Sequence, residues 1–354
     1  MRTENFNDVM ISHPILIGVT VLDAISLAAV LYAAVTAFRV LLNWHPEASS
    51  QSQILLERQS ESAVIAGRFG LAGFVLSSVV LVISISNVLP GIVPGAMCGT
   101  GVCQAADGLF DRAIMFRSAV VAVLITWIGL DRLNCSWPRA PLTKLAARVF
   151  LIGVPLQIMA SLDTLGGSLR LDVRNTVECC ALVYDQVGTG ATVATLWELP
   201  ESYAVTVFIM LSGLLIGVGA SVAASSRFRN AKSGALLAAV AILWIPVAVY
   251  ALVHIFSAYI YGVLQHQCPW CLFLAEHRYI GFPLFLCVAV VGLEGVFAWI
   301  AARLRSRYPE LETACSARMK TAAYRLVITA ILFCLITGMP AISWRLRYGV
   351  WIFG

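Results

Sequence analysis

The residues best suited to chemistry in this chain form the sequence Cys-Pro-Trp-Cys, from Cys268 to Cys271, directly before an apolar stretch. Proline has no backbone N–H to leave unpaired in a first helical turn, so the sequence predicts Cys268 as an N-cap and Pro269 as the first helical residue. A helix N-terminus favours a thiolate over a thiol, and the thiolate is the species that attacks disulfides. We therefore expect Cys268 to be the exchanging cysteine and Cys271 to be the more buried one.

The helix predicted after this pair would bring further side chains to the same face. Arg278 lies seven residues after Cys271, and Phe282 lies four residues after Arg278. The three side chains would therefore lie along one stripe of a continuous helix. We expect them to line a cavity that binds a cofactor, where Arg278 or His277 would stabilise developing negative charge. Pro283 is expected to kink the helix beside this cavity. The alternative is that Arg278 extends to lipid headgroups and Phe282 only packs.

The composition places these residues in a membrane protein. Of the 354 residues, 60% are hydrophobic and only 12% are charged, whereas about a quarter of the residues of a soluble domain are charged. Eight apolar runs approach the ~20 residues that cross a bilayer. They cover residues 15–38, 69–92, 114–131, 146–164, 203–224, 234–257, 280–302 and 322–340. The sequence thus predicts an all-α integral membrane protein with eight transmembrane helices.

The basic residues predict which side of the membrane each loop occupies. Sixteen of the 24 Lys and Arg residues fall in loops on one side, so the positive-inside rule places both termini outside. The net charge of +5 does not require a nucleic-acid partner. We expect a multi-pass protein of the bacterial inner (plasma) membrane, in contact with lipid. Asp23 lies within the first apolar run and is expected to face the bundle interior or a cavity.

The ten cysteines separate by predicted side. Six fall in outer loops, where disulfides persist: Cys98, Cys103, Cys179, Cys180, Cys268 and Cys271. Glycines around Cys98 and Cys103 permit a tight turn, so this pair is either a structural disulfide or a redox-active relay. The adjacent Cys179 and Cys180 can close only a strained ring together, and at least one of them is expected to pair elsewhere.

The order of helices and cysteines over residues 146–303 resembles the vitamin K epoxide reductase family and its relative DsbB. Cys-Pro-Trp-Cys at 268–271 matches the family's quinone-side pair residue for residue. The resemblance implies that Cys271 faces the quinone and that Cys179 and Cys180 are shuttle cysteines. It also implies a four-helix quinone-reducing core, ubiquinone or menaquinone as the cofactor, and a thioredoxin-like or other outer-side dithiol protein as the partner. The loop cysteines are adjacent here, whereas the family separates them.

The resemblance divides the chain into three parts. Residues 1–145 would hold three accessory helices with the Cys98/Cys103 loop, residues 146–303 the four-helix core, and residues 304–354 a cytoplasmic loop, a final transmembrane helix and a tail.

Three functions compete at this point. The leading hypothesis is a membrane thiol–disulfide oxidoreductase that exchanges electrons between outer-side dithiols and a membrane quinone, without a metal. A metal-handling or transport protein would use the same cysteines with His266 and His277 as soft ligands. A non-catalytic membrane subunit would carry only structural disulfides and aid the maturation of a partner.

Overall fold

The computed structural model describes residues 13–45, 50–177, 201–263 and 266–352, and all its long elements in these ranges are helices. Eight of the helices are long and apolar enough to cross a membrane, which confirms the predicted all-helical, multi-pass class. That both ends of the chain lie on the outer side stays a prediction. The chain divides into two compact units, residues 1–179 and 180–354.

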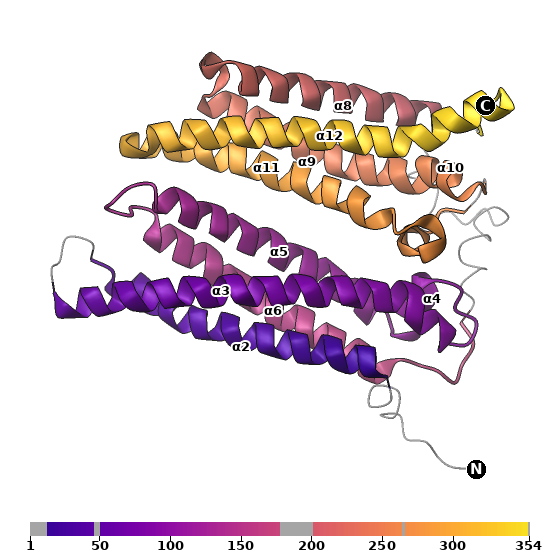
Figure 1. Cartoon of the computed structure of the whole chain (residues 1–354), viewed down its shortest axis with the longest axis horizontal. Helices are drawn as coiled ribbons and strands as arrows, with labels where there is room; N and C mark the ends of the chain where they lie inside the picture. The colour runs from indigo at the N-terminus through magenta and orange to yellow at the C-terminus, as the bar shows by residue number, and fades with distance from the viewer. Residues whose placement is uncertain (1–12, 46–49, 178–200, 264–265, 353–354) are drawn as a thin grey trace, which may run out of the picture. The chain divides into compact units, whose positions relative to one another are not determined.

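The first unit is a ring of four long helices (Figure 1). They are α2 (Pro14–Asn43), α3 (Gln51–Ile83), α5 (Leu109–Asn134) and α6 (Thr143–Arg170). Each packs on the next, and α6 closes the ring against α2, while α3 and α5 contact each other least. Helix α3 continues through a π-helical turn (Ser84–Val88) and a 3₁₀ turn (Leu89–Gly91), and the short α4 (Gly99–Ala105) precedes α5.

A buried polar network joins all four helices of this ring. Arg117 on α5 is 2% exposed and forms an ion pair with Asp23 on α2. Its guanidinium also donates to Ser78 Oγ on α3 at 3.1 Å and to Thr164 Oγ1 on α6 at 2.9 Å. Ser77 Oγ donates to Asp23 Oδ1 at 2.6 Å. The prediction that Asp23 faces the bundle interior is confirmed, and its charge is neutralised there.

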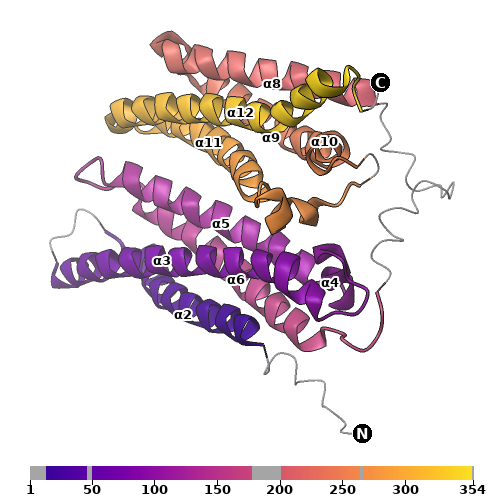
Figure 2. The same ribbon diagram turned by 45° about the vertical axis from the view of Figure 1, so that its right-hand side comes forward.

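The second unit has a ring of the same kind (Figure 2). Its long helices are α8 (Glu201–Ala224), α9 (Ala231–Ala251), α11 (Gly281–Arg307) and α12 (Glu312–Tyr348). Its interior contains an aromatic cluster, in which Trp244 packs edge-on against Phe333 with ring centroids 5.1 Å apart, and the buried Glu294 on α11 forms an ion pair with Arg318 on α12 at 2.7 Å. The indole Nε1 of Trp244 donates to Ser212 Oγ at 2.9 Å, so the buried N–H is satisfied.

The two units share one plan. In each, the second long helix ends in a π-helical turn, Ser84–Val88 in the first unit and Leu252–Phe256 in the second. A segment with two buried cysteines follows, and then the third long helix begins. The cysteines of each unit therefore lie at the end of its ring opposite the two short interhelical loops. This repetition was not predicted.

The packing differs from the predicted division of the chain. Residues 146–303 were expected to form one four-helix core, but α6 completes the first ring and α12 completes the second. The physical reason is visible on α6. Its Gln157 is fully buried and donates to Ser26 Oγ on α2 at 2.9 Å, and Thr164 bonds to Arg117 of α5. Hydrogen bonds between polar side chains help to hold intramembrane helices together, and those of Gln157 and Thr164 join α6 to helices of the first unit.

Candidate redox site

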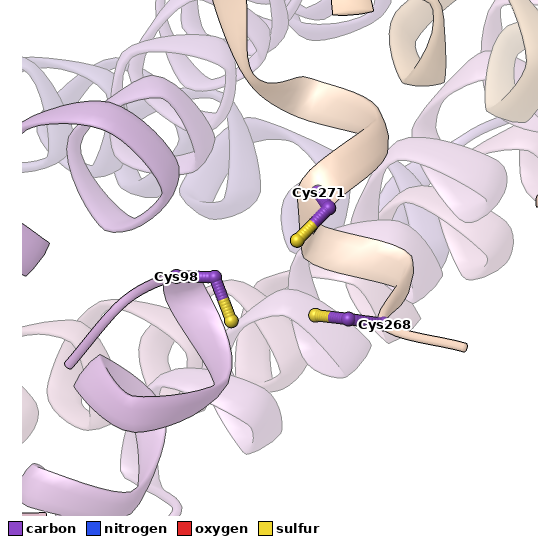
Figure 3. A group of neighbouring side chains, drawn as sticks. All are labelled: Cys98, Cys268 and Cys271. Carbon is purple, nitrogen blue, oxygen red and sulfur yellow. The ribbon is translucent and has the colours of Figure 1, made fainter. Parts of the chain in front are cut away.

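The Cys-Pro-Trp-Cys sequence forms one tight turn in the second unit. Cys268 is the N-cap and Pro269 the first residue of a five-residue 3₁₀ helix, η7 (Pro269–Phe273), which confirms the predicted cap. Residues three apart in a 3₁₀ helix lie directly above one another, because this helix has three residues per turn. Accordingly, the Sγ atoms of Cys268 and Cys271 lie within 4.8 Å of each other, and both residues are buried (Figure 3).

The continuous helix predicted to follow this turn does not form. Helix η7 ends at Phe273, and Leu274 is extended before a second 3₁₀ turn, η8 (Ala275–His277). Arg278 and Tyr279 then adopt left-handed conformations with φ of 54° and 55°, and α11 begins only at Gly281. The predicted stripe of Cys271, Arg278 and Phe282 on one helix is therefore wrong.

The reason lies in Pro283. A helix running from Pro269 through Pro283 would lose a backbone hydrogen bond and bring the proline ring against the carbonyl of Tyr279. Starting α11 at Gly281 places Pro283 in the first turn, where its missing N–H costs nothing. Pro283 thus sets where the helix starts, whereas a kink was expected. Arg278 is exposed in the connecting turn.

Gly281 lets this start of α11 approach the cysteine turn closely. A Cβ atom at this position would lie 2.9 Å from the ring of Phe273 and 3.1 Å from the backbone carbon of Leu272. The close approach aligns three aromatic rings beside the turn. Phe273 stacks on Phe285 with centroids 5.4 Å apart and meets the edge of Phe282 at 5.0 Å. Phe282 thus lies near the cysteine turn by tertiary packing rather than by helical spacing.

A histidine contacts one of the two sulfurs. His266 Nε2 lies 3.0 Å from Cys271 Sγ, within hydrogen-bond range. An imidazole beside a thiol stabilises the thiolate by taking its proton. The expected helix dipole, by contrast, does little to favour a thiolate at Cys268, because a five-residue 3₁₀ helix has only a small dipole. The geometry therefore favours Cys271 as the cysteine that holds the thiolate, contrary to the expectation from its sequence position.

Tyr261 holds this histidine and the turn in place. Its hydroxyl donates to the carbonyl oxygen of Cys268 at 2.7 Å. Its ring meets His266 edge-on at 5.0 Å and lies 4.6 Å from His277. Burial lowers the pKa of His277 from its ordinary value, with Glu276 opposing and His266 adding to this effect. His277 is therefore mostly neutral at pH 7, which suits a hydrogen-bonding role.

The segment before the turn is tied back to α9. The ring nitrogen Nδ1 of His254, in the π-helical turn, lies 2.8 Å from Gln267 Oε1, and Tyr250 stacks on the imidazole at 4.3 Å. Ser257 Oγ also lies 3.4 Å from the carbonyl oxygen of His266. These contacts position the backbone that carries His266 next to Cys271.

The first unit places its two cysteines on α4. Cys98 is the N-cap of this helix and Cys103 its fifth residue, and both are buried (Figure 3 shows Cys98). A tight glycine turn was expected here. The helix separates the two residues by about 7.5 Å along its axis and turns them to different faces. A direct disulfide between Cys98 and Cys103 would therefore require α4 to unwind.

Other predicted site residues cannot be placed. Cys179 and Cys180 lie outside the described residues, so their roles stay predictions. The residue that sequence reasoning undervalued is His266, which was considered only as a metal ligand. Its position two residues before Cys268 gave a usable signal, because a 3₁₀ turn folds Cys271 back towards the segment that precedes it. Tyr261 gave no such signal.

Comparison of the chain with protein-family models, with curated proteins and with solved structures finds no match.

Proposed function

We propose that this protein is a membrane thiol–disulfide oxidoreductase that passes electrons from an outer-side dithiol to a membrane quinone through Cys268 and Cys271. The observation that carries the proposal is the contact of His266 Nε2 with Cys271 Sγ beside a second cysteine held within disulfide reach. Structural disulfides need no such imidazole. A base placed at one sulfur of a Cys-x-x-Cys pair is a means of activating that sulfur.

The contact assigns separate roles to the two sulfurs. A thiolate of the partner attacks Sγ of Cys268 in the oxidised pair, and the bond between the two sulfurs breaks. Cys271 leaves with the electron pair as a thiolate, which protonated His266 stabilises. A leaving thiol that is readily ionised departs faster, so His266 accelerates this step. The partner's second thiolate then attacks the mixed disulfide, releases Cys268 and leaves the partner oxidised.

The surroundings of the pair suit a quinone as the electron acceptor. The rings of Phe273, Phe282 and Phe285 flank the turn and offer faces on which a quinone ring could stack. His277 and the exposed Arg278 are close enough in sequence to supply hydrogen bonds or charge at the rim. When bound, the quinone would accept the two electrons and two protons released as the disulfide re-forms. A ubiquinone or a menaquinone would both serve.

The proposal is tested with purified protein in liposomes. Addition of a dithiol should give oxidation that depends on a quinone in the bilayer and saturates with it, and quinone-free liposomes are the control. No turnover with either a benzoquinone or a naphthoquinone would contradict the proposal. So would a stoichiometric zinc or copper ion in the purified protein, because thiolates held by a metal are not available for exchange.

The role of His266 is tested by the reactivity of Cys271. In a Cys268→Ser background, His266→Gln is expected to slow alkylation of Cys271 by iodoacetamide at pH 7 about tenfold or more, because less of the thiol is ionised. His277→Gln is the matched control, since His277 contacts Tyr261 but has no recorded bond to the sulfur, and should change the rate less than about twofold. Equal rates with and without His266 would remove its proposed role.

A further inference from the structure

The first unit contains a cavity of about 550 Å³ at the end of its ring that carries the short interhelical loops. All four long helices line it. On α2 the lining runs from Ala33 to Trp44, which makes the cavity about 16 Å deep along the helix axis. This volume is within the range of sites for small organic ligands. The cavity takes no part in the redox site, which belongs to the second unit.

The inner part of the cavity is apolar. Small side chains, among them Ala37, Ala63 and Ala147, leave the space, and Trp127 and Phe150 close its deep end with ring centroids 4.7 Å apart. Gly67 allows this arrangement, because a Cβ atom there would lie 2.8 Å from the Trp127 ring, closer than side chains can pack. Such a wall suits a hydrocarbon chain.

The wall of the cavity is charged with both signs. Arg68, which follows Gly67, pairs with Asp131 at 2.7 Å, and nearer the mouth Glu57 Oε1 accepts a hydrogen bond from Gln53 at 3.0 Å. Two further exposed, oppositely charged residues, Glu61 and Arg139, also line the cavity, and among the described residues neither belongs to an ion pair. One carboxylate and one guanidinium thus remain to meet a ligand that has a cation and an anion of its own.

The position of the cavity along α3 matches the interface between the hydrocarbon core of a bilayer and its headgroups. With its following turns α3 spans 41 residues, about 60 Å, which is twice the thickness of a hydrocarbon core. Its polar first turns, which contain Glu57 and Glu61, must therefore project into the headgroup region while Trp127 and Phe150 lie deeper. We infer that the cavity binds a zwitterionic aminophospholipid, with its ammonium at Glu61, its phosphate at Arg139 and the upper part of one acyl chain against the apolar wall.

Labelling of Cys135 can measure whether the cavity is occupied. Cys135 lines it and is exposed, whereas Cys315 and Cys287 are buried. Partial desolvation of the sulfur and the neighbouring Asp131 carboxylate raise the pKa of the Cys135 thiol from its ordinary value, while Arg68 opposes this effect. Maleimide labelling is therefore best followed at about pH 8.5, where more of the thiol is ionised. A lipid headgroup in the mouth of the cavity should shield this sulfur.

The test uses the full chain in phosphatidylglycerol nanodiscs with increasing fractions of phosphatidylethanolamine. The rate of Cys135 labelling is expected to fall saturably as phosphatidylethanolamine is added. Glu61→Gln and Arg139→Gln should each raise, by about fivefold, the phosphatidylethanolamine fraction at which protection of Cys135 is half-maximal. This is the effect of losing one partly exposed charge contact. Glu310→Gln and Arg307→Gln, exposed charges elsewhere in the chain, are the matched controls and should leave it unchanged.

Three results would overturn the inference. The first is a labelling rate that does not change with phosphatidylethanolamine. The second is half-maximal protection of both charge variants at the same phosphatidylethanolamine fraction as the wild type, which would contradict the proposed headgroup contacts with Glu61 and Arg139. The third is equal protection by soluble O-phosphoethanolamine, because a ligand without acyl chains would not need the apolar wall.

Discussion

Replacing Cys271 with serine is expected to reduce quinone-dependent oxidation of a dithiol by at least about 10³-fold, as removal of a reacting nucleophile does in other enzymes. The reason is that Cys271 supplies both the leaving thiolate and the second sulfur of the disulfide that must re-form. A hydroxyl at this position cannot form that bond. The measurement is the initial rate of quinone reduction by purified variants in liposomes at saturating dithiol.

The same assay distinguishes a catalytic cysteine from a merely buried one. Cys287 on α11 is 4% exposed and has no sulfur partner among the described residues, so Cys287→Ser is the matched control and should keep wild-type activity. Cys268→Ser should lose turnover as completely as Cys271→Ser, because each sulfur is half of the disulfide. Wild-type activity in Cys271→Ser would end the proposal for this pair.

Replacing Arg117 with leucine is expected to destabilise the first unit by about 3–5 kcal/mol, the cost of leaving a buried charge without its partner. Asp23 would remain with only the Ser77 hydroxyl as a recorded hydrogen-bond donor in the ring interior. The change in the free energy of unfolding is measured by denaturant or thermal unfolding of the purified protein in detergent, with a probe in the first unit.

Two comparisons show whether the buried charge is the cause. The double variant Asp23→Leu/Arg117→Leu should recover most of the loss, because it removes both charges, and the hydroxyls of Ser78 and Thr164 keep their bonds to backbone carbonyls at 2.7 Å and 2.8 Å. The variant Arg68→Leu breaks an ion pair in which Arg68 is 46% exposed, and it should cost less than about 1 kcal/mol. Equal losses in Arg117→Leu and Arg68→Leu would contradict the argument.

The sequence predicted what depends on composition and local chemistry. Long apolar runs give membrane helices wherever they occur, and proline after Cys268 defines a cap from the residue's own geometry. The sequence could not predict the end of that turn. A short 3₁₀ helix and a long α-helix can begin in the same way, with an N-cap residue followed by a proline. The start of α11 depends on Pro283 and on the close approach at Gly281, which is a tertiary contact.

The assignment of helices to bundles was beyond the sequence for a similar reason. Nothing in the pattern of α6 distinguishes packing on α2 and α5 from packing on α8, since lipid-facing and buried apolar side chains are alike. Pairings such as those of Gln157 with Ser26 and of Thr164 with Arg117 decide it. His266 is an intermediate case: its position two residues before Cys268 was a signal in the sequence, but its 3.0 Å contact with Cys271 depends on how the turn folds.

The π-helical turns have a further consequence for how these helices are aligned. A π turn holds one residue more than an α turn. The side chains on the helix that follows are therefore rotated by about 100° about the helix axis. Beyond Leu252–Phe256, the residues that face the bundle axis are therefore offset by one position from those a regular helix would present. Deletion of one residue within this turn would restore regular winding and rotate Ser257 and Tyr261, on the short helix α10 (Ser257–Tyr261) that follows, away from the carbonyl oxygens of His266 and Cys268. The extra residue of the π turn is thus part of what directs the Tyr261 hydroxyl to the cysteine turn.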